Sequence, residues 1–318
     1  MCIDYRALNK ITARDKYPLP RIDEILDRMS GAKIFSNLDA TSGYYQIGIA
    51  EGDKPKTAFT WKGGFYEFNR IPFGFCNAPA TFQRAMDSLV GNIFPVFVMP
   101  YLDDIIVFSK NEEDHIVHLS AVAKKLKEVG FVLNKKKCNF FKDEIKILGN
   151  IVSKGYFKSD PSKIDSIKNY PFPNNIKELR SFLGLLNHCR EYVKSYLELT
   201  RPLFDELKGE TKNSNRRLVW SENLNDKFTR IKQALSEEIK RKQPDFSREL
   251  ILTTDASNFG IGAVLAQRNV KNQEEIISLF SKSFDKCQMN YSVTDKELLG
   301  VIKGIENYRH YLLGKEFV

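Results

Sequence analysis

A pair of adjacent carboxylates, Asp103 and Asp104, divides an apolar stretch within residues 96–109 into two short runs. Two apolar runs on either side of a polar break predict two strands joined by a tight turn, with the carboxylates at its tip. Residues 33–39 predict another strand, which ends in Asp39. If these strand ends meet, three carboxylates face one another, and the fold has to accommodate their mutual repulsion.

Such a cluster favours a divalent cation, because without one the repulsion would raise a carboxyl pKa or open the site. Hard oxygen ligands select Mg²⁺ or Mn²⁺. The four histidines and five scattered cysteines, with no CxxC pair, disfavour a zinc site or a disulfide framework. The alternative is an ordinary acidic turn, since aspartate is common in turns, and spacing alone favours that alternative.

The composition is that of a globular protein, with 42% hydrophobic and 28% charged residues among 318. This length predicts two or three domains. No apolar run is long enough for a membrane span, and no secretory signal pattern is visible at the N-terminus. We therefore expect a protein of a reducing compartment that is neither secreted nor membrane-bound.

The net charge of +9 favours polyanionic partners, although it is also ordinary for a basic protein. More than half of it lies in residues 154–217, where 13 basic and 8 acidic residues give +5. A solvated helix surface accounts for that excess equally well.

The order of the expected elements indicates an α+β fold. Apolar spacing, caps and glycine stops predict helices at 20–31, 77–89, 112–129, 175–193, 221–240 and 292–313, and a further helix start at Asp160-Pro161. Alternation and turn residues predict strands or hairpins at 33–39, 57–68, 96–109, 250–255, 260–267 and 276–283. Most strands in the first 150 residues are too closely spaced for βαβ crossovers, which favours an antiparallel sheet backed by helices.

The carboxylates lie in ordered motifs. These are Leu38-Asp39-Ala40-Thr41-Ser42-Gly43-Tyr44-Tyr45-Gln46-Ile47, Ile71-Pro72-Phe73-Gly74-Phe75-Cys76-Asn77-Ala78-Pro79-Ala80-Thr81-Phe82 and Tyr101-Leu102-Asp103-Asp104. Further matching segments are Ile3-Asp4-Tyr5-Arg6-Ala7-Leu8-Asn9-Lys10, Leu133-Asn134 with Lys137-Cys138, and Leu148-Gly149 with Val152-Ser153. On these residues the chain resembles, almost end to end, the reverse transcriptases of Ty3/gypsy-type long-terminal-repeat retrotransposons, and more distantly those of retroviruses.

The resemblance implies a right-hand polymerase of fingers, palm and thumb, followed by a connection and a ribonuclease H-like α/β domain. The implied division is fingers and palm at 1–153, thumb and connection at 154–245, and the ribonuclease H-like domain at 246–318. The implied activity is RNA-directed DNA synthesis, with an RNA template, a DNA primer, their hybrid and deoxynucleotide triphosphates as partners. Asp39 and Asp103 would bind two Mg²⁺ (or Mn²⁺) ions, and Asp104 would complete the acidic triad.

The same resemblance assigns residues around the incoming nucleotide. Tyr44 would block a ribose 2′-hydroxyl, and ordinary aromatic packing is its alternative. Phe73 and Gly74 would lie under the nucleotide, where a residue without Cβ lets the backbone approach a ligand closely. Leu148-Gly149-Asn150 would lie in a hairpin that grips the primer end; the alternative is a core strand with a bulge at Gly149.

A second acidic set lies near the C-terminus, where the ribonuclease H resemblance assigns Asp255 and Glu297 to shared metal ions. The alternative for Glu297 is a capping box with Thr294. The family pattern has a third aspartate on a strand after this helix, beyond Val318, so we expect no cleavage of hybrid RNA by these residues alone. We also expect Leu298, Leu299, Ile302 and Ile305 to form an apolar side of the terminal helix that lacks the later strands and helices needed to complete its packing.

Two other functions stay open from the sequence. One is a nucleic-acid-binding retroelement remnant, cut at both ends and without turnover, since the family's basic fingertip residues lie upstream of Ile3. The other, which the complete polymerase motifs disfavour, is a metal-dependent nuclease alone. The resemblance further implies a cytoplasmic location, in virus-like particles or the nucleus, beside other Pol-derived domains.

Overall fold

The structure, a computed structural model, describes residues 3–193, 195–211, 214–235 and 239–318. The chain divides into two compact units, residues 1–145 and 146–318. Within the described residues, no helix combines the length and the apolar character needed to cross a membrane. The four cysteines in the described part, Cys76, Cys138, Cys189 and Cys287, are free thiols.

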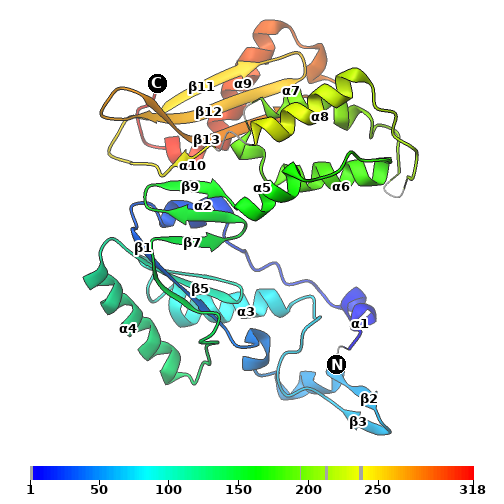
Figure 1. The fold of residues 1–318 in the computed structure, drawn as a ribbon. Helices are drawn as coiled ribbons and strands as arrows, with labels where there is room; N and C mark the ends of the chain where they lie inside the picture. Colours follow the sequence, from blue (N-terminus) through cyan, green and yellow to red (C-terminus); the bar gives the residue numbers. More distant parts are fainter. Residues whose placement is uncertain (1–2, 194, 212–213, 236–238) are drawn as a thin grey trace. The chain divides into compact units, whose positions relative to one another are not determined.

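The first unit is built on an antiparallel four-stranded sheet in the order β4-β5-β1-β6 (Figure 1). Its strands are β1 (Ile34–Asp39), β4 (Val98–Tyr101), β5 (Asp104–Ser109) and β6 (Asn139–Lys142). The predicted hairpin within 96–109 is confirmed as β4 and β5, joined by a two-residue turn in which Leu102 has a φ of 50°. In the central β1–β5 pair, Asp39 lies directly opposite Asp104.

The α-helices in the described part of this unit are α1 (Arg6–Ile11), α2 (Ile22–Arg28), α3 (Ala78–Met86) and α4 (Glu112–Glu128). The core that supports the sheet joins α3 and α4 to the strands through Phe82, Met86 and Val122. After Met86, α3 widens into a π-helical turn, Asp87–Gly91. An ideal Cβ on Gly91 would lie 2.9 Å from Cγ of Pro100, so the glycine lets this turn approach β4 closely.

A separate aromatic hairpin, β2 (Phe59–Trp61) and β3 (Gly64–Tyr66), extends away from the sheet of the first unit (Figure 1). Lys62 and Gly63 form its turn, and both have positive φ angles, 47° and 77°. Two consecutive left-handed residues match the right-handed twist of the flanking strands. The hairpin predicted at 57–68 is therefore confirmed.

The second unit begins with a sheet in the order β10-β9-β8-β7. Its strands are β7 (Glu144–Ile147), β8 (Asn150–Ser153), β9 (Tyr156–Ser159) and β10 (Arg241–Lys242). Leu148 and Gly149 form the turn between β7 and β8, with φ angles of 48° and 82°. The alternative of a core strand with a bulge at Gly149 is wrong, because two left-handed residues reverse the chain there.

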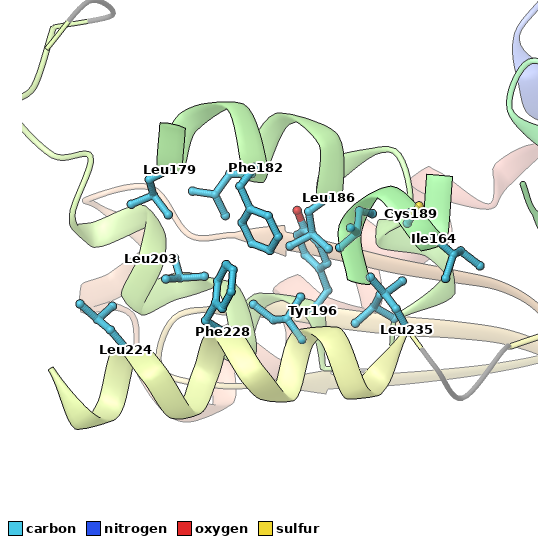
Figure 2. Close-up of a cluster of buried hydrophobic side chains, with 14 of the residues drawn as sticks. Ile164, Leu179, Phe182, Leu186, Cys189, Tyr196, Leu203, Leu224, Phe228 and Leu235 are labelled. Atoms are coloured by element: carbon cyan, nitrogen blue, oxygen red, sulfur yellow. The ribbon is translucent and has the colours of Figure 1, made fainter. Parts of the chain in front are cut away.

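Helices α5 (Pro161–Lys168), α6 (Ile176–Asn187), α7 (Tyr196–Asp205) and α8 (Glu222–Ala234) surround one core in this unit. Figure 2 shows Phe182 of α6 facing Phe228 of α8, and their ring centroids are 4.7 Å apart. The helix expected at 175–193 ends at Asn187, and the one expected at 221–240 ends at Ala234. Residues 236–238 of that expected helix lie outside the described residues.

The C-terminal part contains the three-stranded sheet β11-β12-β13, with α9 against it. Its elements are β11 (Ile251–Ala256), β12 (Gly260–Arg268), β13 (Glu274–Ser283), α9 (Val293–Asn307) and α10 (Arg309–Leu312). The three strands were expected from the alternation of apolar residues. The helix expected at 292–313 is interrupted at Tyr308, where α9 ends.

The residues expected on the apolar side of the terminal helix lie mostly exposed, as an apolar side without packing partners would. Leu298, Ile302 and Ile305 are exposed, and Gly300 and Gly304 face the sheet instead. An ideal Cβ on Gly304 would lie 3.1 Å from Cγ2 of Thr254, so the helix backbone lies nearly against β11. The described helix therefore packs on the sheet through glycine, on another face than these apolar residues.

The cap of α9 differs from the capping box of Thr294 and Glu297 that was the alternative to a metal role for Glu297. Ser292 is the N-cap residue, and its hydroxyl oxygen accepts a hydrogen bond from the backbone N–H of Asp295. Glu297 is therefore not needed to cap the helix.

Candidate active site

The structure brings Asp39, Asp103 and Asp104 together at one edge of the central sheet. Asp39 ends β1 directly opposite Asp104, the first residue of β5. Asp103 precedes it in the turn, and its carbonyl oxygen accepts a hydrogen bond from the N–H of Ala40 at 3.0 Å. Backbone pairing between two strands thus holds three acidic residues at one place, as the sequence predicts.

The electrostatics of the cluster are unfavourable for Asp103. Burial raises the pKa of its carboxyl, and the charges of Asp104 and Asp39 raise it further. Lys137 acts in the opposite direction, with its Nζ 3.9 Å from Oδ2 of Asp39. Asn37 Nδ2 donates a hydrogen bond of 2.9 Å to Oδ1 of Asp104. One cation and one amide therefore offset the repulsion only in part.

The donor set fits a hard divalent cation. Oδ1 of Asp103 is buried and accepts no hydrogen bond from any group in the described part of the chain. A buried carboxylate oxygen with an open lone pair is a ligand that Mg²⁺ or Mn²⁺ can use. Within the same described residues, no group of three or more His, Cys, Asp or Glu side chains, the three aspartates included, is arranged so that it could hold a metal ion. Magnesium does not need such a group, because it commonly takes one or two carboxylates and completes its shell with water and substrate phosphates.

Gly43 makes room for this carboxylate. An ideal Cβ on Gly43 would lie 2.9 Å from Oδ1 of Asp103 and 2.9 Å from the ring of Phe82. No side chain fits in that space without a shift of one of these groups. The glycine in the motif around Asp39 is thus explained by close packing on the acidic turn.

Gln83 is a site residue that the sequence analysis missed. It is fully buried on α3, among residues whose spacing indicates an apolar face. Its Oε1 accepts a hydrogen bond of 2.8 Å from the N–H of Leu102, and its Nε2 donates one of 2.9 Å to the carbonyl of Pro100. One side chain therefore holds both sides of the turn that carries Asp103. A polar residue directly after Phe82, in a helix with an apolar face, was the available signal.

The hydrogen bonds continue from Gln83 to the N-terminal part of the unit. Gln83 Nε2 also donates to Oδ1 of Asp87, at 3.1 Å. Oδ2 of Asp87 accepts from the hydroxyl of Tyr17 at 2.8 Å, which raises the pKa of Tyr17. These hydrogen bonds connect the acidic turn to Tyr17, which precedes the first strand of the sheet in the chain.

Tyr44 lies next to the acidic cluster, Phe73 contacts Tyr44, and Gly74 follows Phe73 in the chain. The Tyr44 ring centroid is 5.1 Å from that of Phe73 and 5.6 Å from that of Phe82. Burial raises the pKa of Tyr44, and the charge of Asp103 raises it further. Gly74 has a φ of 99°, and its carbonyl accepts a hydrogen bond from Asn9 Nδ2 at 2.7 Å. Tyr44 therefore joins the acidic cluster to the aromatic residues Phe73 and Phe82.

Asp255 and Glu297 lie in the second unit, where α9 packs on β11. Asp255 is an exposed residue of β11, and Glu297 is half-buried in α9. An ideal Cβ on Gly300, one helical turn after Glu297, would lie 3.9 Å from the backbone oxygen of Asp255. The helix therefore crosses the strand near both acidic residues.

Comparison with protein families matches both parts of the chain. Residues 1–152 match the family "Reverse transcriptase (RNA-dependent DNA polymerase)". Residues 220–318 match the family "RNase H-like domain found in reverse transcriptase". The resemblance inferred from the motifs is confirmed.

Similar curated proteins are retrotransposon polyproteins. The Pol polyprotein of transposon 297 from Drosophila melanogaster is 39% identical over 99% of this chain and 29% of its own length. That of transposon gypsy from the same organism is 39% identical over 99% of this chain and 30% of its own length. The Tf2-3 polyprotein of Schizosaccharomyces pombe is 36% identical over 98% of this chain and 23% of its own length. The chain thus spans less than a third of these relatives.

Among solved structures, foamy viral protease-reverse transcriptases have the same fold. The complex of one of them with an RNA/DNA hybrid has a TM-score of 0.82 and 27% identity, covering 99% of this chain and 42% of the viral chain. A complex with dsDNA has a TM-score of 0.86 and 26% identity, covering 100% of this chain and 65% of the viral one. The expected α+β polymerase fold with a ribonuclease H-like domain is confirmed.

The raised pKa of Asp103 predicts a pH-dependent gain in stability for Asp103→Asn. A carboxyl whose folded pKa exceeds its unfolded value of about 3.8 stabilises the fold below that value, and this contribution is lost as pH rises through the folded pKa. With a chelator present, the variant should have a higher free energy of unfolding than the parent at neutral pH. The difference should vanish at acid pH. Urea titrations at several pH values measure this difference in unfolding free energy, and Asp143→Asn, at an exposed position, is the control. A lower free energy of unfolding for Asp103→Asn at neutral pH would contradict the prediction.

Removal of the Gln83 amide should destabilise the acidic turn. Gln83→Met keeps the length of the side chain but leaves the N–H of Leu102 and the carbonyl of Pro100 unpaired, at a cost of about 1–3 kcal/mol. Gln233→Met, an exposed substitution on α8, is the matched control and should change the unfolding free energy very little. Equal stability of the two variants in urea unfolding would exclude a clamping role for Gln83.

Proposed function

We propose that the chain is the RNA-directed DNA polymerase part of a Ty3/gypsy-type retrotransposon Pol polyprotein, with a ribonuclease H-like domain after the polymerase region. The two family matches and the similar retrotransposon polyproteins support this proposal. The observation that carries the proposal is the convergence of Asp39, Asp103 and Asp104 at paired strand ends, with a buried oxygen of Asp103 left open. The reaction joins the 3′-hydroxyl of a primer to the α-phosphate of a deoxynucleotide, and pyrophosphate leaves.

Asp39 and Asp103 would hold Mg²⁺ or Mn²⁺, with Asp104 beside them. Two bound ions would lower the pKa of the primer hydroxyl and stabilise charge on the leaving oxygens. The task of the chain is to hold the carboxylates in register against their repulsion. The β1–β5 pairing, Gly43 and Gln83 support this task in the structure.

Tyr44, Phe73 and Gly74 form the proposed site of the incoming nucleotide. The ring contact between Tyr44 and Phe73 fixes the position of the tyrosine beside the carboxylates. A rigid ring at that place would exclude a ribose 2′-hydroxyl by its volume. The positive φ of Gly74 turns the backbone in a way that favours a residue without Cβ.

The proposed partners are an RNA template, a DNA primer, their hybrid and deoxynucleotide triphosphates. Support comes from the foamy viral proteins, which were solved with an RNA/DNA hybrid and with dsDNA. Other Pol-derived domains are further candidate partners, because the relatives are polyproteins. The proposed location is the cytoplasm, with virus-like particles or the nucleus as further proposed locations. We keep 1–153, 154–245 and 246–318 as the proposed domains.

Asp255 and Glu297 are the proposed metal-facing residues of the ribonuclease H-like domain. The crossing of α9 over β11 at Gly300 supports the pairing. The cap formed by Ser292 leaves Glu297 free of a capping role. We expect no cleavage of hybrid RNA by these two residues alone. Cleavage that is lost in Asp255→Asn would mean that another carboxylate, such as Asp295 or Glu306, completes the site.

A primer-extension assay tests the proposal. The parent protein should extend a DNA primer on an RNA template when Mg²⁺ is present, and Asp103→Asn should lose that activity while it stays folded. Asp143→Asn, at an exposed position of the same unit, should retain full activity. Extension by Asp103→Asn within about tenfold of the parent, a barrier change of only about 1.4 kcal/mol, would exclude Asp103 as a metal ligand.

Sugar selection tests the role of Tyr44. Tyr44→Val removes the ring beside the carboxylates and should admit ribonucleotides to the site. The measurement is the ratio of kcat/KM for a deoxynucleotide to that for its ribonucleotide, which should fall in the variant. Tyr44→Phe keeps the ring and should keep the ratio. If Tyr44→Val leaves the ratio unchanged, the ring serves only to pack against Phe73 and Phe82.

A further inference from the structure

An unbroken series of aromatic contacts leads from the proposed nucleotide site to the tip of hairpin β2–β3. Successive ring centroids along it are 5.1 to 6.4 Å apart. Beginning beside Tyr44, the series consists of Phe73, Tyr45, Phe68, Phe59, Tyr66 and Trp61, which we call the aromatic track. All of its members belong to the first unit.

The aromatic track is exposed over much of its length. Phe73, Tyr45, Tyr66 and Trp61 are each between 39% and 49% exposed. A continuous set of large exposed rings is costly in water and marks an interaction surface more often than isolated apolar residues do. The track therefore indicates a surface that another molecule covers.

Local features of the hairpin produce one aromatic face. Phe59 lies directly opposite Tyr66, and Trp61 lies opposite Gly64, so these positions share a side of the hairpin. An ideal Cβ on Gly64 would lie 2.7 Å from the ring of Tyr66. The glycine thus leaves the space that the Tyr66 ring occupies next to Trp61. Phe65, the most exposed ring of the hairpin at 76%, belongs to the opposite face.

The cations beside these rings favour a nucleic acid as the occupant. Lys62 lies at the tip with its Nζ 4.6 Å from the centroid of the Trp61 ring. Arg70 is exposed beyond β3, and its Nη1 donates a hydrogen bond to the carbonyl of Gln46. Aromatic faces with interspersed cations are the features with which proteins bind single strands, through base stacking and phosphate contacts.

The occupant must have unpaired bases, because bases within a duplex already stack on one another and offer no free faces to a row of rings. Among the proposed partners, the template strand that is not yet copied has such bases. We infer that the aromatic track binds the unpaired template strand beyond the primer end, by stacking of its bases on Trp61, Tyr66 and Tyr45. This inference rests on the proposed function, since it takes the bound strand to be a template.

A binding experiment without turnover tests the inference. The full chain is titrated, with a chelator and no nucleotides, against an RNA–DNA duplex with an unpaired template end of about eight nucleotides and against a blunt duplex. Trp61→Ala should weaken binding of the first by about fivefold or more, the equivalent of about 1 kcal/mol of stacking, and leave the blunt duplex unaffected. Trp61→Phe should restore most of the affinity.

Phe65→Ala is the matched control, because it removes a more exposed ring from the other face of the same hairpin. It should leave both affinities unchanged. Equal losses for Trp61→Ala and Phe65→Ala, or no loss for Trp61→Ala, would overturn the inference. A change in self-association with unchanged binding, measured by sedimentation, would also overturn it and assign the face to a protein contact.

Primer extension by the parent protein, measured separately, distinguishes this inference from the proposed function. If the parent extends primers but Trp61→Ala binds both duplexes normally, the inference fails and the proposed function remains. If Trp61→Ala loses the preference for the unpaired end but the parent never extends a primer, single-strand binding is supported and the proposed function fails.

Discussion

The antiparallel pairing of β1 with β5 places Asp39 opposite Asp104, and the other features of the site depend on that register. A shift by one residue would turn each side chain to the other face of the sheet and separate the carboxylates. Buried apolar residues such as Leu38, Ile105 and Val107 specify the register, because they must face a core. Hydrophobic burial therefore provides the force that holds like charges together.

Close backbone packing completes the site. Gly43 lets the segment after β1 lie against Asp103, and Gly91 lets the π-helical turn lie against Pro100. Gln83 then satisfies the backbone of the turn from beneath. Two glycines and one amide thus position an acidic turn that would otherwise relax away from its neighbours. None of these three residues is itself a proposed metal ligand, and each acts by positioning the acidic turn.

The sequence predicted the features that depend on local patterns. Helix α4 follows from the cap at Asn111 and the stop at Gly130, and the acidic hairpin follows from two apolar runs around Asp103. Prediction from the sequence failed where contacts between residues far apart in the chain determine the packing. Gln83 bonds to residues 17 and 19 positions away, and α9 packs through glycines that have no apolar signal. The role of each acidic residue was inferred from resemblance to a family and stays a proposal.

The unbonded oxygen of Asp103 has a thermodynamic consequence for the whole first unit. A cation that binds the folded carboxylates, and not the unfolded chain, stabilises the fold by an amount that grows with the logarithm of its concentration. The melting temperature of the protein would then act as a titration curve for the metal. Ion occupancy could be followed by heating alone, with neither primer nor nucleotide in the sample.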